Sequence, residues 1–73
     1  MKQKQIKYDI EFEREADGRW IAEVTQVPGA MAYGGTRLEA MAKAEALALR
    51  AMAERLEHLE SKPQTVSISF APA

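Results

Sequence analysis

The side chains of this chain that could do chemistry are mainly carboxylates. Asp9, Glu11 and Glu13 recur at every second position, and Glu23 follows in a second segment of alternating apolar and polar residues. Because residues two apart on a strand lie on one face, we expect these carboxylates to gather on one face of a sheet. Paired carboxylates can transfer protons or hold a divalent metal ion, but both roles need a concave, partly desolvated site. A flat sheet face offers no such shelter, so we expect neither a catalytic residue nor a metal there.

The same acidic face has two further interpretations. It is either a solvated surface interleaved with basic side chains, or the contact surface for a basic protein, since complementary charge steers association. For the second interpretation, the candidate partner-binding residues are Asp9, Glu11, Glu13, Ile21 and Glu23.

The histidine and the paired glycines favour structural roles. His58 lies near the expected C-terminus of a helix, where a positive charge suits the helix dipole. The chain has no cysteine or second histidine to complete a transition-metal site with it. Gly34-Gly35 precedes a helix as in phosphate-binding loops, but the lysine before serine or threonine is missing. Thr36 and Glu39 instead match a capping box, so we expect no cofactor.

Length and composition limit the chain to one small domain. Its 73 residues, 47% of them hydrophobic, suffice for one core. We expect a single domain over residues 1–73, with no separate DNA-binding domain. The formal net charge of -1, from 10 basic and 11 acidic residues, argues against binding to nucleic acid or to anionic lipid. Because domains of this size are often marginal alone, we expect a homo-oligomer, with a dimer favoured.

Several absences set the expected compartment. The sequence has no cysteine for disulfides, no apolar run of membrane-spanning length, and a polar N-terminus unlike a secretion signal. We therefore expect a cytoplasmic protein. The lack of asparagine and the density of charge favour a heat-adapted source.

Hydrophobic periodicity predicts four strands and one helix. Apolar and polar residues suggest strands at 6–13, 20–25, 31–33 and 65–70. An Asp-Gly turn at 16–19 joins the first two as an antiparallel hairpin, and Val27-Pro28-Gly29 ends the second. The segment 37–60 contains no helix breaker and is expected to be one long helix. Residues 71–73 are expected to be a loose tail.

The order of these elements predicts an α+β fold, β-β-β-α-β. A helix between two strands normally makes a right-handed crossover to a parallel partner. This gives a single sheet of order 3-2-1-4 with the long helix on one face. The sheet residues expected beneath the helix are Tyr8, Ile10, Phe12, Trp20, Ala22, Val24, Val66, Ile68 and Phe70.

The predicted helix has two apolar sides. We expect the side with the larger residues to pack on the sheet: Leu38, Met41, Ala42, Leu49, Met52, Ala53, Leu56 and Leu59. Glu45 falls within this stripe and should overhang the sheet or find a partner, because an unpaired buried carboxylate is costly. Small residues surround Leu47 on the other side and would let a second helix approach. The candidate subunit interface is Ala40, Ala44, Leu47 and Ala51.

Three short motifs resemble those of a known family. They are Asp17-Gly18-x-Trp20-x-Ala22, Val27-Pro28-Gly29 and Tyr33-Gly34-x-Thr36-x-x-Glu39-Ala40. In this order and spacing they resemble the N-terminal domain of HicB-type antitoxins, over residues 8–56. The resemblance implies a degraded ribonuclease H-like fold without catalytic residues, and binding to a small basic HicA-type toxin that cleaves messenger RNA. Typical members also carry a C-terminal DNA-binding segment, which we do not expect here because the chain ends at Ala73.

Three classes of function follow from these observations. The leading hypothesis is a non-enzymatic, antitoxin-like protein that binds and masks a small basic toxin. The second is a structural or small-ligand-binding homo-oligomer with no toxin partner. The third is an enzyme of the ribonuclease H type, which the scattered carboxylates disfavour because metal-dependent cleavage needs several of them to converge.

Overall fold

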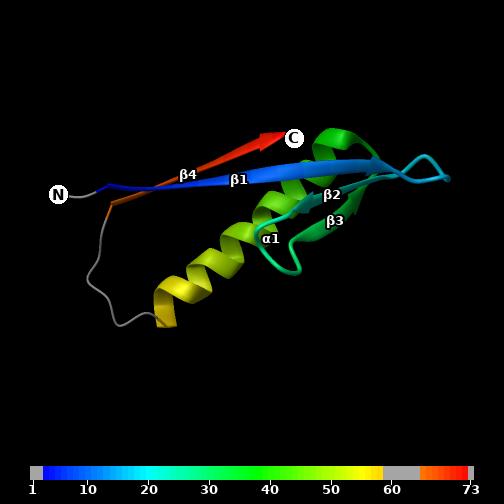
Figure 1. Cartoon of the computed structure of the whole chain (residues 1–73). Coiled ribbons are helices and arrows are strands. Elements are labelled where there is room, and N and C mark those ends of the chain that lie inside the picture. The colour runs from blue at the N-terminus through cyan, green and yellow to red at the C-terminus, as the bar shows by residue number, and fades with distance from the viewer. Residues whose placement is uncertain (1–2, 59–64, 73) are drawn as a thin grey trace.

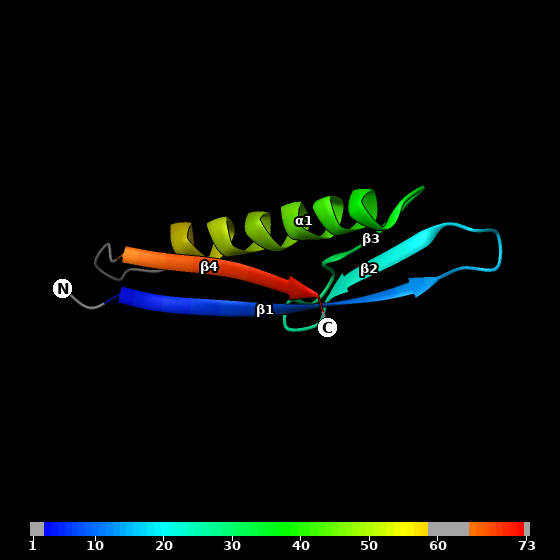
Figure 2. The same cartoon turned by 90° about the horizontal axis from the view of Figure 1, so that it is seen from above.

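The computed structural model describes residues 3–58 and 65–72, which form a four-stranded sheet and one helix (Figure 1). The elements are β1 (Gln3–Arg14), β2 (Trp20–Val24), β3 (Met31–Gly34), α1 (Arg37–His58) and β4 (Thr65–Pro72). The sheet order is β3-β2-β1-β4, with β1 and β4 parallel and the other neighbours antiparallel. The predicted element order, strand order and fold class are confirmed. Figure 2 shows α1 as a separate layer on one side of the sheet.

The strand ends differ from the prediction at both ends of the chain. β1 begins at Gln3, and β4 continues through Ala71 to Pro72, which pairs with Ile10. The predicted loose tail is therefore wrong for residues 71 and 72. Proline is tolerated there because β4 is an edge strand, so its missing N–H can lie on the open side. The predicted end of the helix at residues 59 and 60 lies outside the described residues.

Two glycines with positive φ close the turns of the sheet. Gly18, at φ 90°, donates its N–H to the Glu15 carbonyl at 3.0 Å in the turn between β1 and β2. Gly29, at φ 84°, follows Pro28 in the turn between β2 and β3, where the N–H of Ala30 donates to the Val27 carbonyl at 3.1 Å. Proline followed by a residue with positive φ is typical of a type II turn. Both turns lie where the sequence predicts them.

The start of α1 is held by its cap and by a close approach to β3. Thr36 Oγ1 accepts a hydrogen bond from the Glu39 N–H at 3.0 Å, as the capping box predicts. The Glu39 carboxylate accepts from Lys43 Nζ at 3.0 Å. At Gly34, an added Cβ would lie 2.4 Å from the Ala40 nitrogen. Only glycine therefore lets the end of β3 lie against the first turn of α1.

Small residues, not the large ones, pack α1 against the sheet. Ala40, Ala44 and Ala48 are fully buried, and the helix packs on β2 and β3. Because these three recur every four residues, they form a continuous stripe on one helix face. Because the alanine side chain is small, the helix axis can come close to the sheet. The close contact between Gly34 of β3 and the Ala40 backbone of α1 is consistent with this.

The predicted sheet-facing side is therefore wrong for its leucine residues, although Met41 and Met52 of the same predicted stripe do pack partly against the core. Leu38, Leu49 and Leu56 were expected to face the sheet but are 74%, 45% and 48% exposed. The candidate subunit interface is wrong, because two of its residues are fully buried within the chain and the other two pack partly against the same core. That interface was Ala40, Ala44, Leu47 and Ala51. Leu59, also expected to face the sheet, lies outside the described residues.

The helix side of the sheet follows the prediction. Tyr8, Ile10, Ala22 and Val24 are buried. The partly buried sheet residues packed against them include Phe12, Trp20, Ile68 and Phe70. The placement of the Val66 side chain lies outside what the structure describes.

β1 and β4 extend beyond the other two strands of the sheet. β2 pairs with β1 only over residues 10–14, whereas β4 pairs with β1 over residues 3–10. A ribbon of two strands therefore extends past the ends of β2 and β3 (Figure 1). The extents of 47 × 20 × 15 Å and the radius of gyration of 13.9 Å reflect this shape. A compact domain of this length has a radius of gyration of about 11 Å.

Candidate functional site

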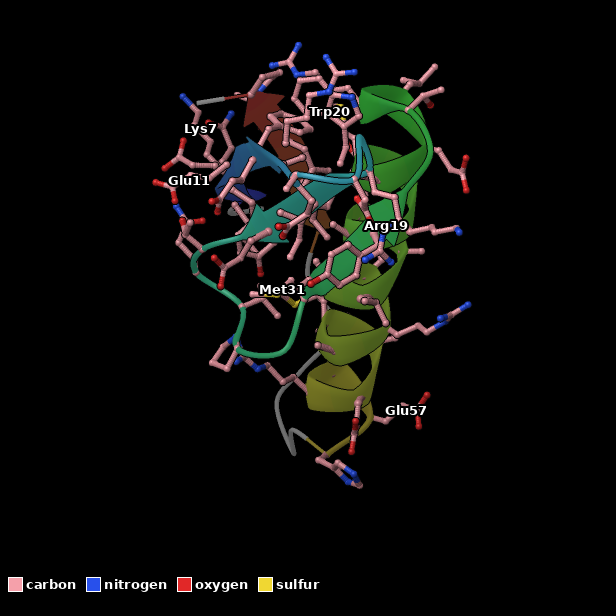
Figure 3. All side chains as sticks on the ribbon, turned by 90° about the vertical axis from the view of Figure 1, so that its right-hand side faces the viewer. Lys7, Glu11, Arg19, Trp20, Met31 and Glu57 are labelled. Atoms are coloured by element: carbon pink, nitrogen blue, oxygen red, sulfur yellow. The ribbon has the colours of Figure 1, made fainter. Side chains whose placement is uncertain are left out.

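The outer face of the sheet, which is the side opposite α1, carries the acidic residues predicted from the sequence. Glu11 pairs with Glu23 across β1 and β2, and Glu13 pairs with Ile21 two positions along. The pleat sends these alternate side chains to the same face. Figure 3 shows Lys7 and Glu11 projecting away from α1. The structure therefore brings together four of the five candidate partner-binding residues.

These residues surround a shallow hollow of about 110 Å³. It is lined by Glu11, Phe12, Glu13, Ile21, Glu23 and Met31. Small-molecule sites usually enclose about 300–1,000 Å³, so the hollow is too small for a substrate or cofactor of ordinary size. Its three glutamates come from β1 and β2, and the apolar part of its lining consists of Phe12, Ile21 and, on the β3 side, Met31. A hollow of this size can receive one protruding side chain of a partner protein.

The three glutamates carry charge that the described residues leave uncompensated. The ion pairs described within residues 3–58 and 65–72 join Arg19 to Asp17, Lys43 to Glu39 and His58 to Glu54. None of them includes Glu11, Glu13 or Glu23. Like charges directly opposite each other on a sheet are destabilising. The pair Glu11–Glu23 therefore weakens the isolated sheet and would be relieved by a cationic partner.

Asp9 has a different environment from the other four residues. Its backbone N–H donates to Gln26 Oε1 at 3.0 Å, and Gln26 Nε2 donates to its carboxylate at 2.8 Å. The Thr25 N–H donates to the Asp9 carbonyl at 3.2 Å. Asp9 thus ties the chain leaving β2 to the middle of β1. The residue that orients it, Gln26, is 17 positions away in a turn, so no strand periodicity could have indicated the contact.

Two apolar residues of the outer face were missed by the sequence interpretation. Met31 pairs with Glu23 and Tyr33 pairs with Ile21, and they are 47% and 45% exposed. The guanidinium carbon of Arg19 lies 4.6 Å from the centre of the Tyr33 ring. β3 has only four residues, too few for alternation to show which of them faces outward. Because Met31 pairs with Glu23, an exposed apolar side chain lies directly beside the acidic residues, on the β3 side of the outer face.

Neither His58 nor the carboxylates converge on a metal site in the part of the chain that is described. No three histidine, aspartate or glutamate residues among them lie close enough to hold a metal ion. His58 Nε2 lies 3.9 Å from Glu54 Oε1, and both side chains are exposed. A second hollow, of about 470 Å³, borders these two residues together with Ala51 and Arg55. Its described lining combines one acid with basic groups, and none of these charged side chains is buried.

Among the residues that the structure describes, the two shifted carboxyl pKa values belong to local structural contacts. A backbone hydrogen bond from Arg19, with the Arg19 side chain, lowers the pKa of Asp17. The hydrogen bond and charge of Lys43 lower the pKa of Glu39, with a further contribution from the Gly35 backbone. Both groups hold a turn or a helix start, and neither lines the acidic hollow.

Comparisons with known proteins add no relative. No protein-family model, curated protein or solved structure matches this chain. Within residues 3–58 and 65–72, no helix has the length and apolar character needed to span a membrane.

Proposed function

We propose that this chain is a non-enzymatic protein-binding domain whose outer sheet face binds and masks a small basic protein. The observation that carries this proposal is the group of uncompensated carboxylates, Glu11, Glu13 and Glu23, beside the apolar residues Ile21 and Met31. Protein interfaces commonly combine a small apolar centre with a charged rim. A basic partner would gain charge complementarity and would remove the repulsion between the paired glutamates.

The partner class that we propose is a HicA-type toxin that cleaves messenger RNA. The support is the resemblance of the three sequence motifs to HicB-type antitoxins, together with the topology. A sheet of order 3-2-1-4 with β1 and β4 parallel agrees with the degraded ribonuclease H-like fold that the resemblance implies. We propose this fold relationship as part of the same hypothesis.

The mechanism would be electrostatic and steric masking. A protein that cleaves RNA needs basic side chains to bind the phosphate backbone. The glutamates of the outer face would pair with those side chains and exclude RNA from them. Because these carboxylates are accessible to solvent, the association should be fast at low ionic strength and weaken as salt is added.

The test is titration calorimetry of the wild-type chain against a purified HicA-type toxin, at low and moderate salt. The double variant Glu11→Lys with Glu23→Lys should weaken binding by about a hundredfold or more, since it replaces attraction by repulsion within the group of carboxylates. It should also fail to inhibit RNA cleavage by the toxin. The matched control is Glu54→Lys with Glu57→Lys, an equal change of charge on the exposed surface of α1 (Figure 3).

Two results would overturn the proposal in different ways. Equal binding by the outer-face variant and the helix control would show that another surface binds the toxin. Absence of binding by the wild-type chain would reject the partner class. In that event the second candidate function, a homo-oligomer without a toxin partner, is favoured by the exposed leucine residues of α1.

A further inference from the structure

The outward side of α1 carries a leucine stripe, consisting of Leu38, Leu49 and Leu56. These residues are 74%, 45% and 48% exposed. Leu38 and Leu56 are roughly five full helical turns apart, and Leu49 deviates from their line by only about 20°. The leucine stripe is therefore straight and runs along most of α1, turned by roughly 130° from the buried alanine stripe. A soluble domain seldom leaves a line of large apolar side chains uncovered.

The chain also exposes more surface than a domain of its size needs to. Its accessible surface is 5455 Å², whereas a folded 8.1 kDa monomer averages about 4,500 Å². The excess, on the order of 1,000 Å², matches the roughly 800 Å² that each partner buries in a standard interface. The excess, to which the extended ribbon of β1 and β4 also contributes, is thus of the size of one stable protein contact.

We propose that a second copy of this chain covers the leucine stripe, by antiparallel pairing of the two α1 helices about a two-fold axis. The axis crosses α1 at the level of Leu47, the middle of the helix. The pairs that it brings together are Leu38 with Leu56, Met41 with Ala53, and Ala42 with Met52. Met41 and Met52 are partly packed against the core of their own chain, and the part of each that stays exposed then faces an alanine, so large and small side chains alternate across the interface. This self-complementarity is what an isologous two-fold interface requires.

The chemistry of the leucine stripe favours a second copy over the basic partner. Glu45 is the charged residue nearest to the stripe, and the charged residues farther round the exposed side of α1, Glu39 and Glu57 with Lys43 and Arg50, have both signs. The exposed side of the helix as a whole therefore gives no strong preference for a basic protein. Glu39 and Lys43 neutralise each other in an ion pair. The acidic hollow lies on the opposite side of the sheet, so helix pairing leaves both outer faces of the dimer free.

Glu45 supplies a distinctive feature of this interface. It is partly buried in the monomer and lies beside the leucine stripe on the helix. In the antiparallel pair it faces Leu49 of the second copy, and the two Glu45 carboxylates lie on either side of the axis. Partial desolvation of two like charges opposes association. Glu45→Gln should therefore tighten the dimer several-fold.

The first test is sedimentation equilibrium from about 1 µM to 1 mM, the range in which interfaces with modest hot spots associate. The wild-type chain should pass from monomer to dimer. Leu49→Lys should weaken the dimer at least tenfold. Met31→Lys is the matched control, because Met31 is 47% exposed and lies on the outer face. Circular dichroism of each variant shows that it is folded.

Cross-linking tests the orientation, and the chain has no cysteine to interfere. An equimolar mixture of Leu38→Cys and Leu56→Cys chains should form a disulfide under oxidation, because antiparallel pairing brings these positions within disulfide reach. Leu38→Cys alone should not. A monomer at every concentration, dissociation by Met31→Lys instead of Leu49→Lys, or efficient cross-linking of Leu38→Cys to itself would overturn the proposal.

Discussion

Glu11 of β1 and Glu23 of β2 stand directly opposite each other on the outer face of the sheet. Residues in this position have Cβ atoms about 4.5–5.5 Å apart, and no ion pair described in residues 3–58 and 65–72 offsets their charges. A fold under selection for stability alone would place opposite charges here. The arrangement instead concentrates negative charge on the outer face, which the proposed basic partner would offset.

Removing one of these charges should stabilise the isolated chain. Glu23→Gln keeps the shape of the side chain and removes the repulsion, so the free energy of unfolding should rise by about 0.2–1 kcal/mol. Urea denaturation at low salt measures the change, and added salt should diminish it. Glu57→Gln is the control on exposed helix surface. A loss of stability in Glu23→Gln would show that the carboxylate makes a favourable contact.

Gly34 should be the least replaceable residue of the fold. A Cβ at this position would lie 2.4 Å from the Ala40 nitrogen, whereas a Cβ at Gly35 would come no closer than 3.7 Å to its nearest neighbour, the Glu39 carboxylate. Gly34→Ala should therefore cost about 3 kcal/mol or more, because α1 must move away from β3. Gly35→Ala should stay within about 0.5 kcal/mol of the wild type. Thermal unfolding of the pair measures the difference, and equal stability would contradict the close approach.

The same close approach explains why the helix face was mispredicted. A prediction from hydrophobic periodicity gives most weight to large side chains, and three of those in α1 form the leucine stripe. The sheet contact is decided by distance: with Gly34 against Ala40, the fully buried helix positions are alanines, and larger side chains such as Leu47 are only partly buried. The sequence shows both apolar sides but not how near the helix axis lies to the sheet. Strand order was predictable because it follows from element order and crossover handedness alone.

Overpacking at the centre of the alanine stripe tests this explanation. Ala44 is fully buried whereas Ala42 is exposed on the same helix. Ala44→Leu should lower the free energy of unfolding by about 1–3 kcal/mol, and Ala42→Leu should change it by less than about 0.5 kcal/mol. Denaturant unfolding in dilute solution, where the proposed dimer would dissociate, provides the comparison. A neutral Ala44→Leu would mean that the helix can shift outward at little cost.

The candidate site was predictable in its charges and not in its apolar part. Period-two spacing is enough to place Glu11, Glu13 and Glu23 on one face. Met31 and Tyr33 joined them only through the register between β2 and β3, which depends on the geometry of the turn at Pro28. A four-residue strand followed by glycine carries too little pattern to reveal that register.

The ion pair of Glu39 and Lys43 should make the start of α1 sensitive to acid. Lys43 lowers the pKa of Glu39 below its ordinary value. At a pH near these pKa values, the Glu39 carboxyl group is therefore protonated less often in the folded state than in the unfolded state. Its stabilising effect is therefore fully present above the ordinary glutamate pKa and is lost as the pH falls through the folded value. Lys43→Met should destabilise the chain at neutral pH, and this difference should disappear in acid. An NMR titration should show the pKa of Glu39 returning toward its ordinary value in the variant. An unchanged titration would mean that the Gly35 backbone hydrogen bond alone sets the pKa.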